Sequence, residues 1–543
     1  MRRMMRQLRG AGVRLLAGVV IEEKWLLQGL WFNLLITLGC VHSMAFGVFH
    51  MEAFLQRGLT ASEVAAVHVL FSVWNPLNDI AAGYLADEWV ARGFGSRLGL
   101  LGWAHAGWAA STLVAFQELL GLPVWLHYAA AIFAADGFGS LAGAVQALVL
   151  VECTSEERQR IQIQRLNSVF GCGEWLVMAI AYGLWDARAG RGGPFRAYLT
   201  TVCLGSAACT LLAVRGLQRP GVAASLPGAA SAAPSGMAAP PAPPGREQPG
   251  PAGRLRPFLW AAARHANFRR YVAVCAVLEA ETLCFRQFDV VLVRILLSSW
   301  PAASRLLLMV GDPLCGALAF LLTWVAERPE VGTYGVTWAT LRVRLALCLA
   351  AAGLLAVHSA TAAAAGAAAL PGGSGGGYVP NSWLAASLGV LMVLCRAATR
   401  PTVAFGGVVF ASVIQEHALL DHERSGAAPA SEETGGVAGA KGSADSVAGK
   451  YWMLRAALTK PLNSLGPVMG SAALASAGYR RPQHEGEPLS VDARLWWTSA
   501  AFPVAVSLAV SLLVLPVWGR FTLHGARLEK VVALAESGRR RSA

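Results

Sequence analysis

The chain has 543 residues, of which 55% are hydrophobic and only 14% are charged. Soluble proteins carry about 25% charged residues, so this composition excludes a soluble globular enzyme, a disordered protein and a disulfide-rich secreted domain. The mean hydropathy is +0.48, and several apolar stretches exceed the ~18 residues at which a membrane helix is expected. We therefore predict an all-α polytopic membrane protein.

The net charge of +13 reflects the placement of basic residues. Arginine and lysine gather in a segment before the first apolar span (1–24), in and beside a central connection (220–256) and in a tail after the last span (521–543). This is the positive-inside pattern, so we expect all three segments, including both termini, on the cytoplasmic side of a lipid bilayer. Because no aromatic residues interleave these charges, the sequence does not predict nucleic-acid binding.

About twelve apolar spans of ~20 residues follow one another along the chain. They predict an N-terminal six-helix bundle at 25–219 and a C-terminal six-helix bundle at 257–520. The connection at 220–256 is rich in Pro, Ala, Gly and Ser, which predicts a flexible linker. Six spans, a basic linker and six more spans are typical of a transporter built from two halves.

The second span contains a polar motif, Asn75-Pro-Leu-Asn78-Asp79-Ile-Ala-Ala-Gly83. On a helix, Asn75, Asp79 and Gly83 share one face, and Asn78 lies beside them. A carboxylate and two amide oxygens, next to the carbonyl that Pro76 frees, suit a proton or a small hard cation. The alternative is an aspartate that only holds two helices together.

Other ionisable residues interrupt the fourth, fifth and eleventh spans, where each needs a partner, water or a function. Asp136 lies in span four, Arg165 and Glu174 in span five, and Lys460 in span eleven. The two aspartates of one half and the lysine of the other can form a buried network across the membrane midplane. Arg165 belongs either to this network or to the cytoplasmic end of its helix, as an anchor.

Arg396 and Arg400 lie one helical turn apart in span ten, where like charges repel unless an anion lies between them. Two sources of that anion remain open. One is internal pairing with acids of span seven, such as Glu279 and Glu281, and the other is a negatively charged substrate.

Enzyme and metal chemistry find no support in the sequence. It contains no phosphate-binding loop, nucleophile elbow, H-E-x-x-H or C-x-x-C motif, and the histidines of the first three spans lack ligand spacing. We therefore expect no enzyme activity, no metal and no cofactor, apart from a proton or sodium as coupling ion.

Five segments resemble the major facilitator superfamily in order along the chain. The span-two motif resembles the signature of melibiose-carrier-type sugar:cation symporters, and the chain as a whole is similar to the transmembrane protein 180 group of that superfamily. The segments are Val73–Asp87, Arg264–Arg270, Val413–Glu423, Leu458–Gly466 and Phe521–Leu528. The resemblance implies a twelve-helix major-facilitator fold of two six-helix bundles.

The resemblance also implies a coupling site. Asp79 and Asp136 match the acids that take part in cation or proton binding, and Asn78 matches the asparagine beside the first of them. Asn75 stands where sodium-using members have a second aspartate, which favours protons or no coupling.

For the substrate, the resemblance implies roles for Arg165 as a contact and for Lys460 as a member of the same polar network. The span-one substrate aspartate of the sugar carriers has no counterpart, since the stretch at 38–40 is uncharged. We place Asp87 and Arg97 in the loop after span two, as candidates for an inner gate.

The function predicted is secondary transport of a small polar solute, with sugars among the candidates, coupled to a cation or proton. The alternative is a major-facilitator fold that does not transport and acts as a membrane scaffold or interaction partner.

Overall fold

The computed structural model describes residues 21, 23–117, 121–154, 157–185, 193–218, 251–366, 382–424, 438–479 and 491–540. Within these ranges the regular structure is entirely helical, without a strand. This confirms the predicted all-α fold.

Six long spans form the N-terminal half. The first is divided by a short π-helical segment, η1, and the other five are continuous helices. Their bounds are α3 (Glu23–Asn33), η1 (Leu34–Leu38), α4 (Val41–Gln56), α5 (Ala61–Ala91), α6 (Arg97–Gln117), α7 (Val124–Cys153), α8 (Glu157–Leu184) and α9 (Gly193–Leu217).

Six more long helices, α12 to α17, form the C-terminal half, with a shorter helix before and after them. The bounds are α11 (Pro251–Arg264), α12 (Ala266–Leu296), α13 (Pro301–Ala326), α14 (Gly332–Gly366), α15 (Ser382–Arg424), α16 (Ala438–Ser476), α17 (Ala493–Gly519) and α18 (Ala526–Arg540). Helix α11 begins inside the segment 220–256 that we predicted as a linker, and most of the described tail at 521–540 is helical.

Side chains at the helix starts explain several of these boundaries. Thr60 and Glu63 form a capping box at α5, in which the Glu63 carboxylate accepts from the Thr60 amide at 2.8 Å. Asp492 accepts from the Leu495 amide at 2.7 Å and so caps α17. Pro301 occupies the first turn of α13, where a missing amide hydrogen costs nothing.

Seven stretches are long and apolar enough to cross a membrane: Trp25–Met51, Val124–Gln146, Gly193–Leu217, Ala302–Ala326, Gly332–Thr361, Ser382–His417 and Ala493–Gly519. The other five long helices, α5, α6, α8, α12 and α16, pack among them. Four of these five carry the buried charges described below, which lower their average hydropathy. The chain is a multi-pass membrane protein.

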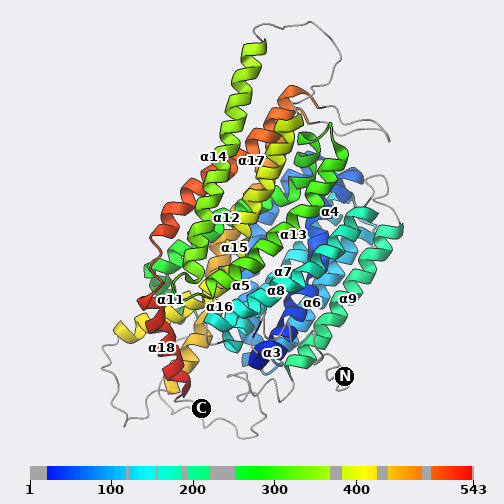
Figure 1. The fold of residues 1–543 in the computed structure, drawn as a ribbon. Helices are drawn as coiled ribbons and strands as arrows, with labels where there is room; N and C mark the ends of the chain where they lie inside the picture. Colours follow the sequence, from blue (N-terminus) through cyan, green and yellow to red (C-terminus); the bar gives the residue numbers. More distant parts are fainter. Residues whose placement is uncertain are drawn as a thin grey trace.

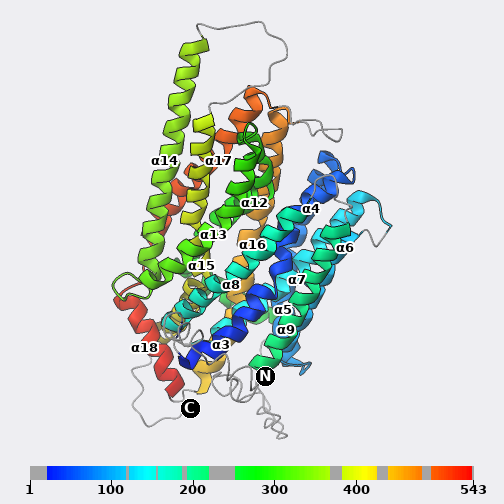
Figure 2. The same cartoon turned by 45° about the vertical axis from the view of Figure 1, so that its right-hand side comes forward.

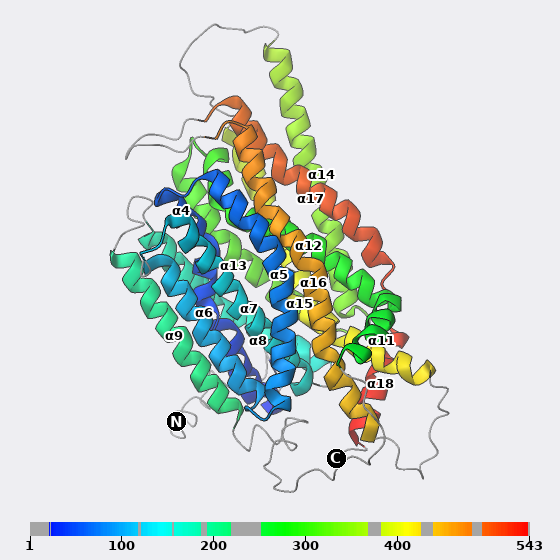
Figure 3. The ribbon, with the colours of Figure 1, turned by 180° about the vertical axis from the view of Figure 1, so that it is seen from behind.

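The twelve long spans form two bundles that lie side by side (Figure 1). Two seams join the bundles. In the α5–α16 seam, α5 and α7 contact α16, and these helices lie next to one another in Figure 3. In the α8–α13 seam, α8 contacts α13 and α15. The two six-helix bundles predicted from the sequence are therefore present.

The first described helix and the last one lie at the same end of the molecule. The start of α3 and the whole of α18 are close to each other in Figure 2. That this end faces the cytoplasm stays a prediction from the positive-inside pattern.

Candidate functional site

A lysine from one bundle lies between two aspartates of the other in the α5–α16 seam. The Lys460 ammonium on α16 is 2.8 Å from an oxygen of Asp79 on α5 and 3.1 Å from an oxygen of Asp136 on α7. We call these three residues the Lys460 triad. It is the buried network across the two halves that the sequence suggested, and it forms an ionic contact between the bundles.

Neighbouring polar groups support the two aspartates unequally. The Asn78 amide donates to the Asp136 carboxylate at 3.0 Å, and Lys460 also donates to the Ser140 hydroxyl at 2.5 Å. Asp79 is fully buried and, within the described residues, its carboxylate has Lys460 as its only polar contact. Asp79 therefore depends on Lys460 for compensation of its charge. Asn75 is also buried, one turn before Asp79, and its side-chain oxygen accepts no hydrogen bond from the described part of the chain.

The charges of the Lys460 triad do not balance when all three groups are ionised. Two carboxylates and one ammonium leave one negative charge in excess, in a region of low dielectric constant where such a charge is costly. Uptake of one proton would make the triad neutral. The triad is thus chemically suited to exchange a proton.

The second ionic contact between the bundles lies in the α8–α13 seam. The Arg165 guanidinium on α8 pairs with Glu327, the residue that follows α13. It also donates to the Thr323 hydroxyl at 3.0 Å and lies over the ring of Trp324, 3.8 Å from its centroid. Arg165 is therefore in a different seam from Lys460 and forms a helix-end contact between the bundles.

Glu327 collects further donors from the first turns of α8. Arg158 donates to its carboxylate at 2.9 Å and Gln162 at 2.7 Å. Burial opposes ionisation of Glu327, but the hydrogen bonds from Arg165, Gln162 and Arg158 outweigh it and hold the pKa of Glu327 below its ordinary value. The Arg165–Glu327 contact is thus ionised at neutral pH.

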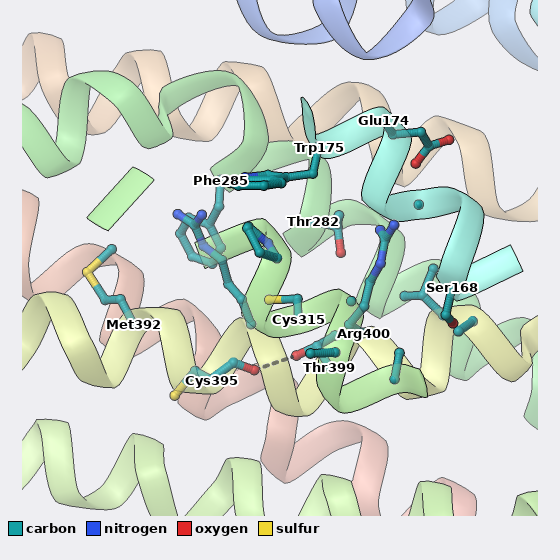
Figure 4. Close-up of a pocket in the computed structure, with 18 of the residues that line it drawn as sticks. Ser168, Glu174, Trp175, Thr282, Phe285, Cys315, Met392, Cys395, Thr399 and Arg400 are labelled. Atoms are coloured by element: carbon teal, nitrogen blue, oxygen red, sulfur yellow. Dashed lines mark hydrogen bonds between the residues drawn. The ribbon is translucent and has the colours of Figure 1, made fainter. Parts of the chain in front are cut away.

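A cavity of about 800 Å³ lies between the bundles and is lined by residues of both. Three predicted site residues line it: Glu174 on α8 and Arg396 and Arg400 on α15. Figure 4 shows Glu174, Trp175, Phe285 and Arg400 around this space. The members of the Lys460 triad are not among the lining residues, so the structure separates the two groups of candidates.

The acids of span seven have partners other than the arginines of span ten. Glu281 accepts from Arg344 of α14 at 2.5 Å and from the Ser507 hydroxyl at 2.5 Å. Glu279 pairs with Arg455 of α16. The sequence did not single out Arg344, Arg455 or Glu327, because a lone charge near a helix end or within a long span does not reveal which helix faces it.

A further buried polar cluster lies at the end of the molecule where α18 packs. Glu416 on α15 has no exposed surface, and it accepts from Asn267 at 2.9 Å and from Arg527 at 2.5 Å. His265 lies 3.6 Å from the same carboxylate. Three of the five segments behind the family resemblance meet here, which was a signal available in the sequence. The cluster fastens α18 to the C-terminal bundle.

The two predicted gate residues are placed differently from our expectation. Helix α5 continues to Ala91, so Asp87 is part of that helix, and Arg97 is the first residue of α6. The loop between them is only residues 92–96, and neither residue belongs to it. The side chain of Asp87 lies outside the described part of the structure.

Within the described residues there is no group of three or more His, Cys, Asp or Glu side chains that could hold a metal ion.

Comparison with known proteins gives similarity only at the level of solved structures. No protein-family profile and no curated protein matches the sequence. A double-tryptophan mutant of XylE is similar, with a TM-score of 0.49 and 15% identity over 93% of this chain and 98% of that chain. The E. coli fucose:proton symporter FucP has a TM-score of 0.45 and 13% identity over 89% and 98% of the two chains. A bacterial homologue of the human lysosomal transporter Spinster has a TM-score of 0.47 and 12% identity over 94% and 96%.

Proposed function

We propose that this chain is a secondary active transporter of a small polar solute, of the major-facilitator type and related to the melibiose-type carriers. The observation that carries the proposal is the Lys460 triad, because a charged contact between two bundles can break and re-form as access to the central cavity alternates. The cavity of about 800 Å³ supplies a solute site of ordinary size.

The coupling ion that fits this arrangement best is a proton. A sodium ion would need several oxygen ligands around a space of its own, whereas the Lys460 ammonium already lies between the two carboxylates. Asn75, in the position of a second aspartate, removes one further charge from such a site. Protonation of Asp79 or Asp136 cancels the excess charge without another ligand.

The mechanism follows from the unequal support of the two aspartates. When the bundles move apart at the α5–α16 seam, Lys460 leaves with its bundle, and Asp79 loses its only charged partner. Asp79 then takes up a proton or becomes hydrated, while Asp136 keeps its hydrogen bond from Asn78. The protonation of Asp79 is thereby linked to the position of the bundles.

The test is uptake and current in proteoliposomes that contain purified protein. Sugars, sugar acids and amino acids are applied under a proton or a sodium gradient to the wild type and to Asp79→Asn. We expect accumulation of at least one solute driven by the proton gradient and lost in Asp79→Asn, although this variant should unfold at a temperature close to that of the wild type.

A control variant and a defined negative outcome make this test decisive. Glu63→Gln removes an exposed carboxylate of the same helix, far from the triad in sequence, and should leave uptake unchanged. If neither tracer uptake nor solute-induced thermal shift occurs with any member of the panel, the transport proposal fails and the scaffold alternative takes its place.

A further inference from the structure

The central cavity contains a cation that has no partner among the residues that the structure describes. Arg400 lines the cavity near the midpoint of the stretch Ser382–His417, and it forms no hydrogen bond or ion pair with the part of the chain that the structure describes. In Figure 4 its side chain extends from α15 toward α8. A guanidinium at this depth in a membrane protein is expensive unless it meets water, an acid or a ligand.

The carboxylates that line the same cavity are engaged elsewhere. Glu281 is held by Arg344 and Ser507, and Glu174 also interacts with another group. Arg400 is thus left as a positive charge directed into the solute space. The planar fork of a guanidinium matches the two oxygens of a carboxylate better than any neutral group.

Two hydroxyl groups of the cavity wall donate their hydrogen within their own helices and can therefore accept from a solute. Thr282 and Thr399 each donate their hydrogen to the backbone carbonyl four residues earlier in the same helix, at 2.7 and 2.9 Å respectively. Their oxygen lone pairs remain available to the cavity. A solute that meets them must offer hydrogen-bond donors, as hydroxyl groups do.

The size and the remaining lining of the cavity point to an organic solute. About 800 Å³ is far more than an inorganic ion fills and lies within the range of small-molecule sites. Trp175 and Phe285 present aromatic surfaces to the same space (Figure 4), which suits the carbon skeleton of the solute.

We propose that the transported solute is a hydroxylated organic anion, such as a sugar acid, whose carboxylate binds Arg400 and whose hydroxyl groups donate to Thr282 and Thr399. This inference rests on the transport function proposed above. It selects the substrate-anion alternative for Arg400, because the acids of span seven are paired with other arginines.

The positive charge of the cavity can be measured without knowing the solute. Cys395 lines the cavity five residues before Arg400 on the same helix, so its reactivity toward charged thiol reagents reports the local potential. In a chain with the other nine of the ten cysteines replaced by serine, we compare an anionic and a cationic methanethiosulfonate reagent of similar size. Both rates are normalised to those of a free thiol in solution.

We expect the anionic reagent to modify Cys395 roughly tenfold faster, and we expect Arg400→Gln to bring the ratio close to one. Arg342→Gln is the matched control, because this exposed arginine of α14 stacks on Trp338 outside the cavity, and the ratio should not change. If the cysteine-reduced chain fails to fold, the full chain with and without Cys395→Ser gives the same difference. A ratio at or below one, a ratio unaffected by Arg400→Gln, or no modification by either reagent overturns the proposal.

Uptake into proteoliposomes then tests the solute class with a matched pair of probes. D-glucuronate and D-glucose share ring and hydroxyl groups and differ in the carboxylate. We expect D-glucuronate to be taken up and to protect Cys395, with both effects lost in Arg400→Gln. If D-glucose alone is transported and Arg400→Gln retains that uptake, the anion inference fails while the transport proposal stands. If neither is taken up despite a tenfold ratio at Cys395 and protection by D-glucuronate, the cavity binds anions and the transport proposal fails.

Discussion

Removal of the lysine from the Lys460 triad should cost far more stability than removal of either acid. Lys460→Met leaves Asp79 and Asp136 as two buried carboxylates without a cation. Asp79→Asn instead leaves one carboxylate and one ammonium, which balance. The difference follows from charge counting alone, since both substitutions remove one charged group from the same contact.

The magnitudes follow from the geometry of the triad. Loss of one partner of a buried ion pair costs about 3–5 kcal/mol, and we assign this range to Lys460→Met, because the Lys460 side chain is only 19% exposed. Asp79→Asn should cost less than about 1 kcal/mol, because an amide can accept from the retained ammonium. The double variant leaves only Asp136, which Asn78 supports, and should lie between the two single variants.

Thermal unfolding in detergent, followed by tryptophan fluorescence, ranks these variants. We expect the order wild type, Asp79→Asn, double variant and Lys460→Met from most to least stable, with Lys460→Arg close to the wild type. Because protons can replace the missing cation, acidification should recover part of the stability of Lys460→Met. The reasoning is refuted if Lys460→Met unfolds at the wild-type temperature, or if adding Asp79→Asn to it lowers the unfolding temperature further.

Three other predictions concern the seams and the α18 cluster. Gly83→Val should destabilise the fold by about 1–3 kcal/mol in thermal unfolding, because an added side chain meets Met453 of α16, and Met453→Ala should restore the loss. Glu327→Gln should accelerate hydrogen–deuterium exchange at 157–166 and 320–330, relative to the wild type. In the wild type, exchange in these segments, corrected for its intrinsic rate, should not vary between pH 5 and 8. The reason is that hydrogen bonds outweigh burial and hold the pKa of Glu327 below 4.5, so the stability that its charge contributes is present above this pH and is lost only below it. Burial lowers the pKa of His265 from 6.5 to about 4. Its contribution to the free energy of unfolding is therefore complete above pH 6.5 and falls by about 2 kcal/mol as the pH drops to 5. Thermal unfolding at each pH should detect this dependence, and His265→Asn should abolish it.

The sequence was sufficient to predict the long helical spans and their division into two bundles. Hydrophobic length carries this information directly, as in α13 and α17. The same criterion does not detect α11 and α18, which are short, and it does not detect the π-helical break at η1. These features depend on tertiary packing and on hydrogen bonds between segments that are distant in sequence.

The charged residues of the site could be predicted from the sequence, but their ion-pair partners could be predicted only in part. Asp79, Asp136 and Lys460 stand out because each interrupts an apolar stretch. The partner of Arg165 could not be read from the sequence, since Glu327 lies just beyond a helix end, where an acid is ordinary. The partner of Glu281 depends on the rotation of α12 against α14, which the helical period within a single span does not fix.

The two seams carry opposite arrangements of charge. In the α5–α16 seam the N-terminal bundle supplies acids and the C-terminal bundle the base, whereas in the α8–α13 seam Arg165 of the N-terminal bundle meets Glu327 of the C-terminal one. In each half, the base lies on the fifth long span, and the opposing acid is on or just after the second span of the other half. If the two halves are exchanged, the acid and the base of one seam take the places of the acid and the base of the other. A pseudo-two-fold relation between the halves requires this correspondence.

The two contacts lie at different positions along their helices, so they would take different parts in the rocking motion of the proposed transport cycle. Glu327 follows the last residue of α13, so separation of the helix ends would break the Arg165–Glu327 contact first. Asp79 is near the middle of α5, close to where a rocking axis would pass, so the same rotation displaces Lys460 less. A helix-end contact that opens early and a proton-sensitive contact near the axis that opens late would couple opening to protonation in a fixed order.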